Sequence, residues 1–225
     1  MVEWSEINTY EKLRIWLNNG NDINDTNYIN NSPLHLFCEN YRKSIICQTR
    51  LINIISFLIE NNANINQKNI YNCSPLHNIC KNNSQELLSP NELIEIMNLL
   101  LKNGANINQK NINGATPLHY VCKYNPSIET INFLLEKGAN INEKDYDGWA
   151  AFHYIFYFKT QLIASLKELI SFLIEKSTSE SGSYGIKIND KDNYGFTTLH
   201  CVCSNNNPPI EIISFLIDNL SLIHI

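Results

Sequence analysis

Residues 111–142 read NINGATPLHYVCKYNPSIETINFLLEKGANIN, a stretch that predicts two short helices placed between two turns. Gly114 is suited to the positive φ angle of a tight turn, because glycine has no Cβ atom. Thr116 is a good N-cap, and Pro117 fits the first helical turn, where its missing N–H breaks no hydrogen bond. NPSIE starts a second helix with a broad apolar face, and Gly138 is placed to end it in the left-handed conformation.

Two short motifs recur along the chain in the same order, and residues 111–142 hold one copy of each. The first motif begins at Ser32 (SPLHLFC), Ser74 (SPLHNIC), Thr116 (TPLHYVC), Ala150 (AAFHYIF) and Thr197 (TTLHCVC). The second motif ends at Asn24 (GNDIN), Asn66 (NANIN), Asn108 (GANIN), Asn142 (GANIN) and Asn189 (GIKIN). Because a helix pair this short cannot bury both of its apolar faces, each copy must stack on its neighbours.

With both motifs in register, the chain resembles an ankyrin-repeat protein, a family with a period of about 33 residues and the motif T-P-L-H-x-A. The resemblance implies an all-α repeat solenoid, in which stacked helix–loop–helix repeats are joined by β-hairpin-like loops. We expect a single ankyrin-repeat domain over 1–225 that starts with a capping half-repeat at 1–24. The full repeats are expected at 25–66, 67–108, 109–142, 143–189 and 190–225. The last one lacks a clear polar cap, so we expect either a covering partner or a continuing array.

Three of the repeats carry insertions. The first two are longer than the third between their paired helices, and Ser89, Pro90 and Glu92 predict the start of the second repeat's outer helix. In that prediction they serve as N-cap, first-turn proline and capping-box acid. The fourth repeat contains STSESGSYG at 177–185, whose composition predicts a flexible surface loop, with a phosphorylation segment as the alternative.

The composition argues against several classes of function. The formal net charge is −5, from 22 acidic and 17 basic residues, and the basic residues do not cluster in the sequence as a nucleic-acid surface requires. No stretch approaches the roughly 18 uninterrupted apolar residues of a membrane span, and the N-terminus has no secretory pattern. The seven cysteines lie mostly in apolar helical stretches, which favours reduced thiols. We therefore expect a cytoplasmic or otherwise intracellular protein that binds neither nucleic acid nor membrane.

Four His-x-x-Cys pairs raise the question of a metal site. They are His35/Cys38, His77/Cys80, His119/Cys122 and His200/Cys203. Each pair belongs to a different repeat, and Phe156 takes the cysteine's place in the fourth repeat. The resemblance implies that the histidine bonds the backbone between hairpin and helix, and that the cysteine fills a small buried site, for which it is suited. We therefore expect no metal and no cofactor.

No catalytic motif is present in the sequence. It contains no glycine-rich phosphate loop, no His-Glu-x-x-His and no Gly-x-Ser-x-Gly, so we expect no catalytic residue and no enzymatic activity. The resemblance adds one modification. Asn66, Asn108 and Asn142 match the position at which ankyrin-repeat proteins are substrates of an asparagine hydroxylase.

The resemblance implies that the chain binds a protein partner, as an interaction module or scaffold, along a concave groove of hairpin tips and inner helices. In the first three repeats the groove is expected to hold Tyr28, Ile29, Glu39, Ile70, Tyr71, Lys81, Ile112, Lys123 and Tyr124. The candidate partner-binding residues are Tyr124, Tyr146, Trp149, Tyr157, Phe158, Tyr194 and Phe196. Aromatic clusters at exposed positions favour interface hot spots.

Alternatives exist at two levels. Tyr157 and Phe158 have the alternative of packing inside their own repeat, and Trp149 and Phe196 that of stacking on each other as a hairpin brace. For the whole chain, one alternative is a host-directed effector or viral ankyrin adaptor that recruits a target to degradation machinery. Such adaptors usually carry an F-box-like C-terminal segment, which is not visible here. The other is a structural array that self-associates through its apolar C-terminus.

Overall fold

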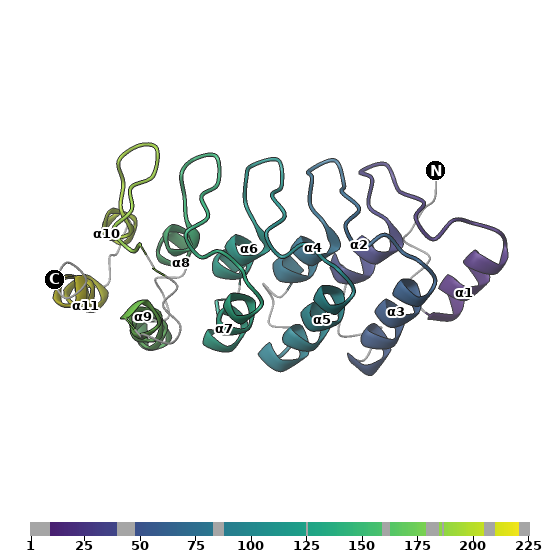
Figure 1. Cartoon of the computed structure of the whole chain (residues 1–225), viewed down its shortest axis with the longest axis horizontal. Coiled ribbons are helices and arrows are strands. Elements are labelled where there is room, and N and C mark those ends of the chain that lie inside the picture. Colours follow the sequence, from purple (N-terminus) through teal and green to yellow (C-terminus); the bar gives the residue numbers. More distant parts are fainter. Residues whose placement is uncertain are drawn as a thin grey trace. The chain divides into compact units, whose positions relative to one another are not determined.

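The computed structural model describes residues 10–39, 48–82, 88–124, 126–158, 163–178, 185, 187–204 and 210–220. These residues form eleven helices and no strand, which confirms the predicted all-α class (Figure 1). In chain order the helices are α1 (Tyr10–Asn18), α2 (Pro33–Glu39), α3 (Gln48–Glu60), α4 (Pro75–Asn82), α5 (Pro90–Lys102), α6 (Pro117–Tyr124), α7 (Ile128–Glu136), α8 (Ala151–Phe158), α9 (Ile163–Thr178), α10 (Thr198–Cys203) and α11 (Ile210–Leu220).

The chain forms two compact units, Met1–Ile112 with α1 to α5 and Asn113–Ile225 with α6 to α11. In each unit a hairpin-like loop leads into every pair of helices (Figure 1). Helix α2 packs beside α4 in the first unit, and α8 packs between α6 and α10 in the second. The first helices of successive pairs are therefore neighbours, as the stacked helix–loop–helix solenoid predicts. The organisation of 1–225 as a single domain stays a prediction.

The helix starts agree with the sequence pattern. Proline is the first residue of α2, α4, α5 and α6, where its missing N–H costs nothing. Ser89 caps α5 by accepting the backbone N–H of Glu92 (3.3 Å), and the Glu92 carboxylate accepts the backbone N–H of Ser89. This capping box confirms the predicted start of that helix. The insertions of the first two repeats lie mainly outside the described residues, as does the loop predicted at 177–185, whose first two residues end α9.

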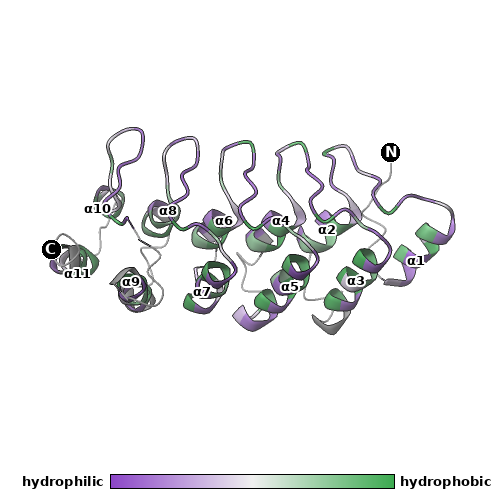
Figure 2. Ribbon diagram, in the orientation of Figure 1, coloured by the Kyte–Doolittle hydropathy of each residue, from purple (hydrophilic) through white to green (hydrophobic). Residues whose placement is uncertain are grey.

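The core of each unit lies between its two helical layers. Figure 2 shows apolar residues on the facing sides of the helices, whereas the hairpins are mostly hydrophilic. In the first unit Leu93, Ile96 and Leu100 of α5 are completely buried. In the second unit Phe152 and Phe156 of α8 are the largest fully buried side chains. None of the described helices is long and apolar enough to cross a membrane.

Four of the hairpins are stabilised by an Asn or Asp side chain that the sequence analysis did not single out. Asp145 is an example, because its Oδ1 accepts the backbone N–H groups of Asp147 (3.0 Å) and Trp149 (2.8 Å). Such a side chain fixes a tight turn by satisfying two backbone donors at once. Equivalent pairs of bonds are made by Asn27, Asn69 and Asp192.

Neighbouring hairpins are joined at their tips by backbone hydrogen bonds. In the second unit the N–H of Tyr146 donates to the carbonyl of Asn113 (2.9 Å), and that of Asn193 to the carbonyl of Asp147 (3.0 Å). The first unit has matching bonds from Ile70 to Ile29 and from Ile112 to Tyr71. The turns require positive φ angles, and the predicted residues provide them: Asn30, Asn72, Gly114 and, at the end of α7, Gly138.

Candidate functional site

His35, His119 and His153 of the first motif bind the backbone of two successive repeats. The Nδ1 atom of His119 accepts the backbone N–H of Thr116 (3.1 Å), so the ring proton is on Nε2. Nε2–H then donates to the carbonyl of Trp149 in the next repeat (3.0 Å). His35 and His153 make the same two kinds of contact. These bonds agree with the structural role that the family resemblance implies.

Burial controls the protonation of the motif side chains. Desolvation lowers the pKa of His35 to about 4, and it also lowers the pKa of His119 and His153. The same cause raises the pKa of the Cys38 and Cys122 thiols. These imidazoles are therefore neutral and these thiols protonated at pH 7, which is unlike the poised groups of a catalytic site.

The cysteine of the last repeat differs from the prediction. Cys38, Cys80 and Cys122 are buried as expected, whereas Cys203 is exposed. Cys203 is the last residue of α10, whereas the other three cysteines lie inside their helices. The buried cysteine of α10 is Cys201, and desolvation raises the pKa of its thiol to about 11.

The described residues contain no group of three or more His, Cys, Asp or Glu side chains that could hold a metal ion. A closed zinc site normally needs four ligands at about 2.0–2.3 Å. We therefore expect elemental analysis of the purified protein to find no stoichiometric zinc, and EDTA to leave its melting temperature unchanged. One zinc per chain, with unfolding on chelation, would contradict this expectation.

The candidate hydroxylation sites Asn66 and Asn142 bridge neighbouring hairpins. The side chain of Asn66 donates to the carbonyl of Gly104 (2.8 Å) and accepts the N–H of Asn106 (2.8 Å). Asn142 makes the equivalent bonds to Gly185 (2.9 Å) and Lys187 (3.0 Å). Both amides therefore have a structural role, and hydroxylation of Asn66, Asn108 and Asn142 stays a prediction.

The groove residues of the first unit fall into two groups. Tyr28, Ile70, Tyr71 and Ile112 are exposed at the hairpin tips, as predicted, whereas Ile29 is half-buried. The two predicted charges of the inner helices instead face each other. Lys81 Nζ lies 3.5 Å from Glu39 Oε1, and Asn31 donates to the other oxygen of Glu39 (3.1 Å). Because both side chains of this ion pair remain partly exposed to solvent, the pair contributes little to stability.

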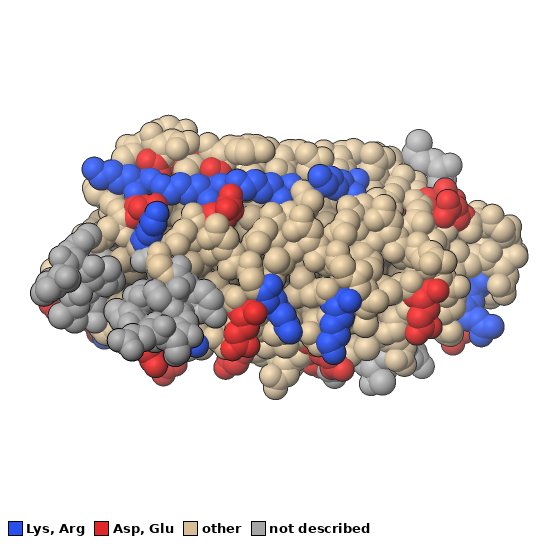
Figure 3. All heavy atoms as spheres, in the orientation of Figure 1, with Lys and Arg blue, Asp and Glu red and all other residues tan. Residues whose placement is uncertain are grey.

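Lysines gather on the hairpins, a feature that the sequence analysis missed. Figure 3 shows Lys and Arg side chains along the hairpins of each unit, with acidic side chains beside them in the second. Four copies of the second motif are followed, two residues later, by a lysine. These lysines are Lys68, Lys110, Lys144 and Lys191. Lys144 Nζ lies 3.2 Å from Asp190 Oδ2. The lysines are one repeat apart in sequence, so counting local clusters does not detect them.

The aromatic candidates of the second unit differ in exposure. The exposed fractions are 65% for Tyr146, 44% for Tyr157, 73% for Tyr194 and 49% for Phe196. The side chains of Trp149 and Tyr124 are half-buried and therefore less exposed than predicted. Tyr124 lies beside Tyr120, with 5.7 Å between ring centroids, and under Lys123 Nζ. The side chain of Phe158 is outside the described residues.

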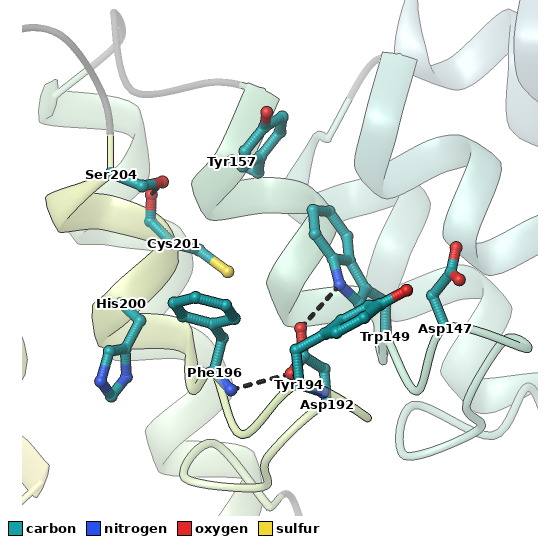
Figure 4. A pocket seen from close by; sticks show the side chains of 9 residues that line it. All are labelled: Asp147, Trp149, Tyr157, Asp192, Tyr194, Phe196, His200, Cys201 and Ser204. Carbon is teal, nitrogen blue, oxygen red and sulfur yellow. Dashed lines mark hydrogen bonds between the residues drawn. The ribbon is translucent and has the colours of Figure 1, made fainter.

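Four of these aromatic residues surround an open pocket of about 340 Å³ in the second unit, which we call the aromatic pocket (Figure 4). Its lining residues are Asp147, Trp149, Tyr157, Asp192, Tyr194, Phe196, His200, Cys201 and Ser204. They come from the hairpins and inner helices of the fourth and fifth repeats, which are groove elements. The structure thus brings Trp149, Tyr157, Tyr194 and Phe196 together, whereas Tyr124 and Tyr146 do not line the pocket.

A change of side-chain size at one repeat position accounts for two walls of the pocket. The residue before the first motif is Cys73 in the second repeat and Ala115 in the third, and both are buried. The same position holds Trp149 in the fourth repeat and Phe196 in the fifth. Their rings line the aromatic pocket instead of being fully buried.

Trp149 braces the two hairpins, but it does so through a hydrogen bond. Its indole N–H donates to Asp192 Oδ2 (3.0 Å), and its ring lies edge-on to Tyr154 (5.3 Å) and Tyr157 (5.2 Å) between centroids. The alternative that Trp149 stacks on Phe196 is therefore not observed. Phe196 lies edge-on to His200 of its own repeat, at 5.5 Å. The buried Asp192 carboxylate needs donors, and the indole supplies one.

Trp149→Ala is expected to lower the free energy of unfolding by about 2 kcal/mol, because it removes the ring contacts with His153, Tyr154 and Tyr157 and a donor to a buried carboxylate. Tyr194→Ala is the matched control, since Tyr194 is exposed and its ring packs on no other described ring. Tyr194→Ala should leave the free energy of unfolding within about 0.5 kcal/mol of that of the parent. Urea unfolding of both variants provides the measurement, and equal stability of Trp149→Ala and the parent would contradict the bracing role.

Comparison with known families agrees with this repeat geometry. A model described as "Ankyrin repeats (3 copies)" matches residues 43–145 and 89–166, and one described as "Ankyrin repeats (many copies)" matches residues 162–217. The chain therefore belongs to the ankyrin-repeat family. Ankyrin repeats generally mediate interactions between proteins. A search of curated proteins found no match to the chain.

Proposed function

We propose that this chain is a non-enzymatic interaction module that binds a partner protein through the concave groove of its hairpin tips and inner helices. The aromatic pocket of the fourth and fifth repeats is its main contact. The observation that carries this proposal is the convergence of Trp149, Tyr157, Tyr194 and Phe196 on one open pocket.

Energetics support this choice of surface. Large aromatic side chains contribute most of the binding energy at protein interfaces, and a pocket lets a partner's side chain be buried on several sides. Tyr194 and Phe196 are exposed although each could bury substantial apolar area in a complex. A partner that spans several repeats would make the chain a scaffold.

Self-association is a second candidate, because α11 exposes apolar side chains. Ile210 is 75% and Ile217 54% exposed, and both lie on the last described helix. A second copy could cover them. The adaptor alternative, with recruitment of degradation machinery, has no support among the described residues beyond the binding groove itself. An intracellular location is our inference from the composition and the cysteines within apolar helices.

Affinity capture followed by mass spectrometry tests the proposal. The pocket variant is Tyr194→Ser with Phe196→Ser, and the matched control is Tyr28→Ser with Tyr71→Ser in the first unit. Circular dichroism first establishes that both variants melt like the parent. We expect at least one protein to be retained by the parent and the control and lost with the pocket variant. Identical retention by all three proteins would contradict the proposed surface, and recovery of this chain alone would favour self-association.

A further inference from the structure

The aromatic pocket carries negative charge without a positive partner. Asp147 and Asp192 are among its lining residues, and none of those residues is Lys or Arg. The Asp192 carboxylate is buried, and it accepts N–H groups from Trp149, Tyr194 and Phe196, two of which are drawn in Figure 4. These bonds come from neutral donors, and no Lys or Arg side chain lines the pocket beside this carboxylate.

Asp147 is the charge that a bound group would meet. It is exposed at the hairpin tip of the fourth repeat, and its carboxylate makes no hydrogen bond or ion pair with the described residues. Only its backbone is engaged, with Asp145 and Asn193. An acid with no partner beside aromatic rings is therefore available to a ligand at no cost to the fold.

We propose that the aromatic pocket receives an arginine side chain of the partner protein. This inference rests on the proposed function and specifies the chemistry of the partner at that site. Aromatic faces attract cations, and a planar guanidinium stacks on them while its N–H groups reach a carboxylate. Arginine suits such walls better than lysine because it is less strongly hydrated. An acidic or phosphorylated side chain is disfavoured, since Asp147 and Asp192 would repel it.

The first test is a titration of the uniformly ¹⁵N-labelled full chain at pH 7.5 with N-acetyl-arginine amide. The reporter is the indole N–H of Trp149, assigned with Trp149→Phe. N-acetyl-citrulline amide is the matched control probe, because it has the size of arginine and no charge. We expect the arginine probe to shift the Trp149 indole and the Tyr194 and Phe196 amides, with affinity on the order of millimolar. Citrulline should bind about tenfold more weakly.

Variants of the protein test the two parts of the pocket separately. Asp147→Asn is expected to weaken the arginine probe about fivefold and leave the citrulline probe unchanged. Glu168→Gln on α9 is the matched control, since it removes the same charge from an exposed site that does not line the pocket. Tyr194→Leu should weaken arginine binding, whereas Tyr194→Phe should preserve it, because phenylalanine keeps the aromatic face. The effect of Asp147→Asn should also shrink as salt is raised.

The outcomes separate this inference from the proposed function. Equal binding of arginine and citrulline, or no response of the Trp149 indole to either probe, would overturn the arginine assignment. If Asp147→Asn and Glu168→Gln weaken binding of the arginine probe equally, the assignment is also overturned, because the attraction would then come from the net charge of the protein and not from the pocket. In each case the proposed function would still stand if the capture experiment shows a partner lost with the pocket variant.

Discussion

Acidification from pH 7 to pH 4 is expected to lower the free energy of unfolding by about 3 kcal/mol through His35 alone. The pKa of this buried imidazole is about 4 in the folded protein and 6.5 in an unfolded chain. Between pH 6.5 and pH 4 the unfolded state therefore binds a proton at His35 that the folded state does not bind. The stabilisation is complete above pH 6.5 and is lost as the pH falls towards 4. His119 and His153 act in the same direction, because burial lowers their pKa as well.

Urea unfolding at a series of pH values between 7.5 and 4.5 measures this effect. His35→Gln should be less stable than the parent at pH 7.5, because the hairpin bonds to Ser32 and Cys73 are weakened. Its stability should also fall less steeply as the pH is lowered, because the unfolded variant cannot take up the proton that His35 binds in the unfolded parent. A variant whose stability falls as steeply as that of the parent would show that the buried histidine is not the cause.

Gly148→Ala is expected to cost about 3 kcal/mol of stability, because two separate penalties act at this position. Its φ angle is 82°, in the left-handed region that alanine avoids. An added Cβ would also lie 2.6 Å from the backbone nitrogen of Asn193, closer than real contacts allow. That nitrogen belongs to the next hairpin, which bonds to Asp147, so relief would require the two hairpins to separate.

Gly138→Ala is the matched control for the angle alone. Gly138 has a φ angle of 91°, but an added Cβ would meet nothing within 4 Å, so the expected cost is about 1 kcal/mol. Thermal and urea unfolding of the two variants give the comparison. Equal costs at the two positions would contradict the close approach between hairpins. Gly148→Asn should be costly as well, although Asn30 and Asn72 occupy the equivalent turn position with φ angles of 58° and 54°.

The periodicity of the sequence was enough to predict the repeats and most helix starts. Residues such as Pro117, Ser89 and Gly138 act through local backbone geometry, which depends on a few neighbours in sequence. The predicted position of each residue within its repeat was therefore reliable. The exposure of Cys203 was not predicted, because burial at that position depends on the repeat that follows.

The arrangement of the candidate site depended on packing between repeats. The sequence indicated that Trp149 and Phe196 occupy the same repeat position, but it could not indicate which of their rings would meet. The partner of Trp149 is Asp192, which is 43 residues away and follows a segment of irregular length. Asp145 and Asp192 occupy the same repeat position in the last two repeats, and the first three repeats have Asn at that position. This change from Asn to Asp is the signal that could have identified the acidic side of the pocket.

Site-specific photo-crosslinking tests the central claim most directly, because it reports which side chains touch the partner. The photoreactive residue p-benzoylphenylalanine replaces Tyr194 in one sample and Glu168 in a second. Each is irradiated in extract from cells that express the protein. We predict a discrete covalent adduct with another protein from position 194 and none from position 168. Adducts of equal yield from positions 194 and 168, or none from position 194, would contradict the account.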